Sequence, residues 1–136
     1  RELVTRVTDV SIFPLIDACM LARYEIARDS LENLLADGAT ASQILGLLAR
    51  QVRLLLQAHE LEPRRVAPGR LARALGISSD FQAEKIARQS SSTSLERLRS
   101  LHTLLLEIDG WIKGGRLREG IALEILVARM CGVGNS

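Results

Sequence analysis

The spacing of leucine and isoleucine is the feature that most constrains the fold. Between Leu95 and Gly114, apolar residues recur at intervals of three and four: Leu98, Leu101, Leu105, Ile108 and Ile112. This spacing places them on one face of an α-helix, because the helix completes a turn every 3.6 residues. Apolar and polar residues never alternate for more than a few positions, as they would in a half-buried strand. The pattern predicts an all-α protein.

Capping residues divide the rest of the chain into further helices, which we expect at 11–23, 24–38, 40–63, 68–90 and 116–132. Ser11 is the expected N-cap of the first, with Pro14 in its first turn. Thr40 and Gln43 have the spacing of a capping box. Gly76 is expected to divide 68–90 into two short helices, with Ser78 or Ser79 capping the second. Three side chains of that second helix are expected to point inward: Phe81, Ile86 and Ala87.

The length limits how these helices are arranged. A chain of 136 residues can bury one good core, so about six or seven helices in a single bundle are expected. We assign residues 1–10 to the end of a preceding domain or a linker, 11–132 to the helical domain and 133–136 to a frayed tail. The first residue is Arg1, which suggests a fragment of a longer protein. The last helix is apolar around most of its circumference.

The charges are unevenly distributed, although the net charge is only +2. Residues 50–100 contain ten basic and five acidic side chains. This excess fits either a solvated, arginine-rich face or a surface for nucleic acid or an acidic partner. No apolar run approaches the ~18 residues of a membrane span, so no membrane partner is expected. Cys19 and Cys131 are expected to be buried thiols of a reduced, cytoplasmic protein.

Residue patterns that carry catalysis are missing from the sequence. It has no glycine-rich phosphate loop, no His or Glu spacing for a metal, and no nucleophile near an orienting acid. The sequence therefore predicts a binding module without enzyme activity, cofactor or small-molecule substrate.

Three residues near the end of the 95–113 helix are candidates for an interface or a helix-end signature: Asp109, Trp111 and Lys113. Asp109 and Lys113 are four residues apart in the order that favours a surface ion pair, worth ~0.3 to 0.5 kcal/mol. Gly114 or Gly115 is expected to end the helix. Trp111 either closes the core or contacts a partner at the rim of an interface.

The segment 71–89 has the pattern of a helix-turn-helix, with Gly76 in the turn and a polar second helix. Its candidate DNA contacts are Arg64, Arg65, Arg70, Arg73, Lys85 and Arg88. Asp80 and Glu84 oppose this reading, because carboxylates in the first turn of the second helix would repel phosphates. The alternative is a structural helix pair.

Three leucine-rich stretches follow one another in a characteristic order: "ILGLLARQVRLLLQAHEL" (44–61), "LARALGISSDFQAEKIARQ" (71–89) and "LHTLLLEIDGWIKGGRLREGIALEILVARM" (101–130). Together they resemble the C-terminal domain of the delta subunit of the bacterial DNA polymerase III clamp loader. Their order and spacing match the family, and "SIFPLIDACMLARYEIARDSLENLLADG" (11–38) fits its first helices. Asp109 and Lys113 match the acid and the lysine of the family's third stretch. The serines of "SSSTS" (90–94) and Gly114 depart from residues common there.

The resemblance implies a helical collar domain. In the family, such domains from delta, delta prime and tau or gamma join into a ring that holds the clamp loader together. The loader places the sliding clamp on DNA during replication, and delta opens the clamp through an N-terminal region that is absent from this sequence. The resemblance therefore implies a chain that assembles with those subunits and has no active site of its own.

Overall fold

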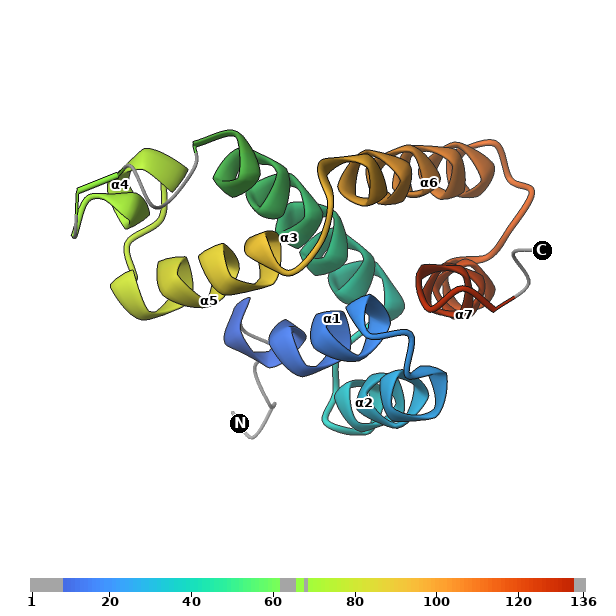
Figure 1. Ribbon diagram of the computed structural model, residues 1–136. Helices are drawn as coiled ribbons and strands as arrows, with labels where there is room; N and C mark the ends of the chain where they lie inside the picture. Colours follow the sequence, from blue (N-terminus) through green and yellow to red (C-terminus); the bar gives the residue numbers. More distant parts are fainter. Residues whose placement is uncertain (1–8, 62–65, 68, 134–136) are drawn as a thin grey trace. The chain divides into compact units, whose positions relative to one another are not determined.

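The computed structural model describes residues 9–61, 66–67 and 69–133, and this part of the chain contains helices and no strand (Figure 1). A 3-10 turn and seven α-helices follow one another: η1 (Asp9–Ile12), α1 (Phe13–Met20), α2 (Tyr24–Ala36), α3 (Ala41–Leu61), α4 (Leu71–Leu75), α5 (Asp80–Ser91), α6 (Leu95–Lys113) and α7 (Glu119–Met130). The all-α prediction is confirmed. Residues 1–8 and 134–136 of the expected terminal segments lie outside the described residues, as does Pro63.

The chain divides into two compact units. Unit 1 comprises residues 1–48 and 103–136, and unit 2 comprises 49–102, so that the division falls within α3 and α6. Unit 1 has eight basic and eleven acidic side chains, a net charge of −3, whereas unit 2 has ten and five, a net charge of +5. The basic excess of the middle of the sequence therefore belongs to one structural unit.

Unit 1 is built on contacts among α1, α2 and α7. Its core is aliphatic apart from one phenylalanine, and it includes Phe13, Leu15, Ile16, Leu31, Leu123 and Leu126. These residues follow the three- and four-residue spacing of their helices, which places them on the faces that meet. Cys19 and Cys131 form no disulfide and are both buried here, so the expected burial of the two thiols is confirmed.

Two local predictions in unit 1 have different outcomes. The capping box is confirmed, because the Gln43 amide donates to Thr40 Oγ1 at 3.1 Å and the Thr40 amide donates to Gln43 Oε1 at 2.9 Å. The expected N-cap at Ser11 is wrong. The N-cap of α1 is Ile12, since the 3-10 turn η1 occupies residues 9–12 and delays the α-helix to Phe13. Pro14 still lies in the first turn.

Unit 2 holds α5 against α3 partly through polar contacts. Gln51 Nε2 donates to Gln89 Oε1 at 3.1 Å, and Ser90 Oγ donates to the Leu55 carbonyl at 3.1 Å, all within the buried interior. Pairing satisfies these groups where water cannot reach them. The Gln89 amide and the Ser90 hydroxyl therefore stabilise the packing of α5 against α3.

The pair α4 and α5 has the predicted division. Gly76 ends α4 in the left-handed conformation, with φ +76°. Ser79 is the N-cap of α5, and its hydroxyl accepts from the Gln82 amide at 3.1 Å.

Phe81 does not point inward as expected: it is 58% exposed. The inward face of α5 is formed by Ala83, Ile86 and Ser90, which are spaced three and four apart, and Phe81 lies off this stripe. Of the other residues expected inside, Ile86 is buried and Ala87 is half-buried.

Candidate interaction surface

The end of α6 carries the ion pair expected from the sequence. Lys113 Nζ lies 2.8 Å from Asp109 Oδ2, and the two side chains are 76% and 53% exposed. A pair this exposed adds little to the stability of the fold, because water screens both charges and the two side chains lose conformational entropy when they pair. Its contribution to folding is that of an ordinary i,i+4 helix pair.

Removing this pair should change the free energy of unfolding by no more than about 0.5 kcal/mol. Asp109→Asn, Lys113→Met and the double variant, compared by urea denaturation, test this. The coupling energy of the double-mutant cycle isolates the pair from the helix propensity of the new residues. A coupling energy above about 1 kcal/mol would show that the pair is a structural element and not a surface feature.

The turn after α6 sets the direction in which the chain enters α7. Gly115 has φ +78°, its amide donates to the Ile112 carbonyl at 3.0 Å, and the Arg116 amide donates to the Trp111 carbonyl at 2.8 Å. This arrangement is a Schellman-type helix end, in which a left-handed glycine lets two amides reach the last carbonyls. Of the two glycines expected to end the helix, Gly115 therefore supplies the left-handed residue.

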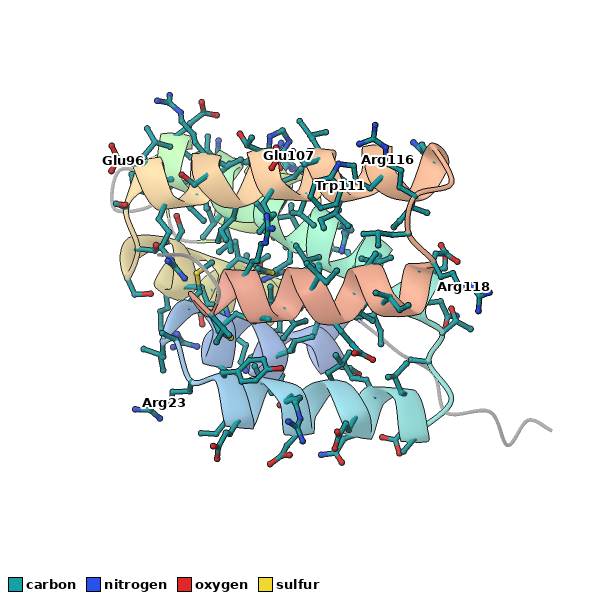
Figure 2. All side chains as sticks on the ribbon, turned by 90° about the vertical axis from the view of Figure 1, so that its right-hand side faces the viewer. Arg23, Glu96, Glu107, Trp111, Arg116 and Arg118 are labelled. Atoms are coloured by element: carbon teal, nitrogen blue, oxygen red, sulfur yellow. The ribbon has the colours of Figure 1, made fainter. Side chains whose placement is uncertain are left out.

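Trp111 is neither fully buried nor fully exposed. It lies half-buried near the end of α6, and the Arg129 guanidinium of α7 is 5.8 Å from the centre of its ring. Figure 2 shows α7 between α2 and the end of α6 where Trp111 is labelled. Trp111 therefore joins α6 to α7 while part of its ring stays accessible.

A groove between α2 and α7 was not predicted from the sequence. Its volume is about 360 Å³, and the side chains of Leu31, Leu123 and Val127 form an apolar floor. Arg28, Glu32 and Glu124 add charged groups to its lining. The sequence did contain a signal for it, since α7 is apolar around most of its circumference and one helix face cannot bury all of that surface.

Small and exposed residues complete the groove. Ala41 and Gly120 line the groove with side chains too small to fill its space. Leu35 of α2 also lines it and is exposed. All of the groove's lining residues belong to unit 1. The groove is therefore a feature of one compact unit. Its lining residues from α7 follow Trp111 in the sequence by fewer than 20 residues.

The basic residues proposed for DNA belong to unit 2. Arg70, Arg73 and Arg88 are exposed, whereas Lys85 is half-buried, with its ammonium 5.5 Å from the centre of the Phe81 ring. Arg64 and Arg65 lie outside the described residues. Asp80 and Glu84 are exposed in the first turns of α5. Carboxylates at that position oppose insertion of α5 into a DNA groove.

Two classes of site find no support in the part of the chain that the structure describes. It holds no group of three or more His, Cys, Asp or Glu side chains that could bind a metal ion. None of its helices combines the length and hydropathy that crossing a membrane requires.

Comparison with known families identifies the chain. The model of the family described as "DNA polymerase III delta subunit, C-terminal domain" matches residues 9–130, from η1 to the end of α7. The chain belongs to this family. The resemblance stated from the sequence is thereby confirmed, and the helix-turn-helix alternative is not favoured. No curated protein matches the chain.

A solved structure agrees with the family in its fold. The DNA clamp loader delta protein of Bacillus subtilis is similar, with a TM-score of 0.82 and 23% sequence identity. The similarity covers 96% of this chain and 38% of that protein, so the chain spans well under half of its length. At this identity the likeness establishes the all-helical fold of a delta C-terminal domain.

Proposed function

We propose that this delta C-terminal domain is a non-catalytic oligomerisation domain, the collar domain through which a clamp-loader delta subunit joins delta prime and tau or gamma. The assembled loader would place the sliding clamp on DNA during replication in the cytoplasm. The observation that carries the proposal is the family match over residues 9–130. Clamp opening and ATP hydrolysis are assigned to parts of the assembly other than this chain.

Exposed apolar side chains in unit 1 support a role in association. Six large apolar residues of the described part of this unit are more than 40% exposed: Leu21, Ile26, Leu35, Leu106, Ile121 and Val133. Single exposed apolar residues are common on monomers, but Leu35 also lines a groove with an apolar floor. Such a surface is suited to burial against another protein.

The proposal is tested by light scattering after size exclusion, with the chain alone and mixed with full-length delta prime and tau from the same source. We expect a mixed complex whose mass includes the chain and which persists from low to high salt, because buried apolar area resists screening. A chain that stays monomeric with every partner would refute the proposal. Tight binding of duplex DNA that falls steeply with salt would favour the DNA-binding alternative instead.

A further inference from the structure

We propose that the groove between α2 and α7 receives one amphipathic helix of a partner subunit. The apolar side chains of that helix enter the groove, and its basic side chains lie beside the acidic wall formed by Glu32 and Glu124. The inference rests on the proposed function and deepens it, because it names the face of the domain that docks and the chemistry of what docks there.

The dimensions and chemistry of the groove fit a helix. A helix that binds in a groove presents apolar anchors at i, i+3 or i+4, and i+7. The floor offers Leu31 from α2 together with Leu123 and Val127 from α7, which are themselves four residues apart on one helix face. A volume of about 360 Å³ holds a few side chains and excludes a folded domain.

The charges around the groove select a basic partner. The lining of the groove contains two acidic side chains and one basic one, a net charge of −1, and α2 and α7 as a whole contain five acidic and two basic side chains, a net charge of −3. Arg28 Nε lies 3.7 Å from Glu32 Oε2, so the positive charge of Arg28 is already paired within α2. Arg129 lies against Trp111, which belongs to α6. Glu124 has no cationic partner among the residues that the structure describes, and it lines the groove.

The same charges argue against a second copy of this chain on this face. A two-fold dimer would place the same surface on both sides of the contact. The acidic walls of the two copies would then oppose each other, which costs affinity. A separate subunit that presents lysine or arginine beside its apolar anchors avoids this repulsion.

Gly120→Leu fills the groove with little risk to the fold. Gly120 is exposed, and a Cβ at this position would meet no heavy atom within 4 Å. Leucine should leave the melting temperature unchanged or raise it, since glycine is a poor helix residue. We expect at least about a 10-fold weaker affinity for the delta prime and tau mixture, because the leucine occupies the space of an anchor. Gly46→Leu on α3, equally open, is the matched control and should bind like the unmodified chain.

Glu124→Lys tests the charge of the wall. We expect its affinity to fall by about 10-fold at low salt and by less at high salt, because the added lysine repels a basic helix. Glu107→Lys on the exposed face of α6, labelled in Figure 2, makes the same charge change away from the groove and should have little effect.

The outcomes separate this inference from the proposed function. If the unmodified chain forms no complex, the proposed function fails and the groove inference fails with it. If the complex forms and both Gly120→Leu and Glu124→Lys bind normally, the groove inference alone is wrong. If the unmodified chain dimerises by itself and Gly120→Leu makes it monomeric, the occupant is a second copy and the partner-helix proposal is overturned.

Discussion

Replacing Phe13 with alanine should lower the free energy of unfolding by about 3 to 5 kcal/mol. Phe13 is the first residue of α1, is only 2% exposed and belongs to the core of unit 1. Alanine would leave a cavity that the surrounding helices can close only in part. A loss of this size removes a large share of the ~5 to 15 kcal/mol that stabilises a typical domain. Urea denaturation followed by far-UV circular dichroism and by Trp111 fluorescence measures it.

The chain supplies its own control, because it contains only one other phenylalanine. Phe81 is 58% exposed and contacts the Lys85 ammonium, so Phe81→Ala should cost at most about 1 kcal/mol. The two variants remove the same atoms from two environments. Equal losses would contradict the assignment of Phe81 to the surface and would restore the inward position expected from the sequence.

Gln89→Leu should destabilise unit 2 by about 1 to 3 kcal/mol, although leucine and glutamine are similar in size. The Gln51 amide that donates to Gln89 Oε1 is buried, and the substitution removes its acceptor. Leaving a buried donor without a partner costs more than the hydrogen bond itself contributes to stability. Urea denaturation followed by circular dichroism is the measurement.

The double variant Gln51→Leu with Gln89→Leu distinguishes an unsatisfied amide from lost packing. With both amides gone, neither partner of this hydrogen bond is left unpaired, and most of the lost stability should return. A double variant that is less stable than Gln89→Leu alone would show that the two amides act through shape, or through further contacts of Gln89, and not through the bond between them.

Local rules predicted the helices because local residues determine them. The three- and four-residue spacing that ends at Gly114 and Gly115 gave α6 and its turn, and Thr40 with Gln43 gave the start of α3. The prediction failed at Ser11, where a 3-10 turn that spacing does not encode comes before α1. It failed at Phe81 because hydrophobicity alone predicts an inward aromatic residue, whereas position 81 lies off the buried stripe of α5.

The candidate surface was harder to predict than the fold. The ion pair of Asp109 and Lys113 follows from their spacing along one helix, so it could be expected. The groove depends on how α2 and α7 meet, although these helices are more than 80 residues apart in the sequence. Leu35 and Ile121 resemble core residues in the sequence, and only the packing shows that both are exposed. Contacts between distant segments are what spacing rules omit.

The positions of the cysteines allow the local opening of unit 1 to be measured separately from that of unit 2. Cys19 and Cys131 are the only two thiols of the chain, and both are buried in this unit. A thiol reagent can reach a buried sulfur only after local opening, so the labelling rate under native conditions reports the population of opened molecules. Unit 2 has no cysteine and contributes nothing to this signal. Slower labelling when partner subunits are added would reveal, without any engineered probe, that assembly holds α1 and α7 closed.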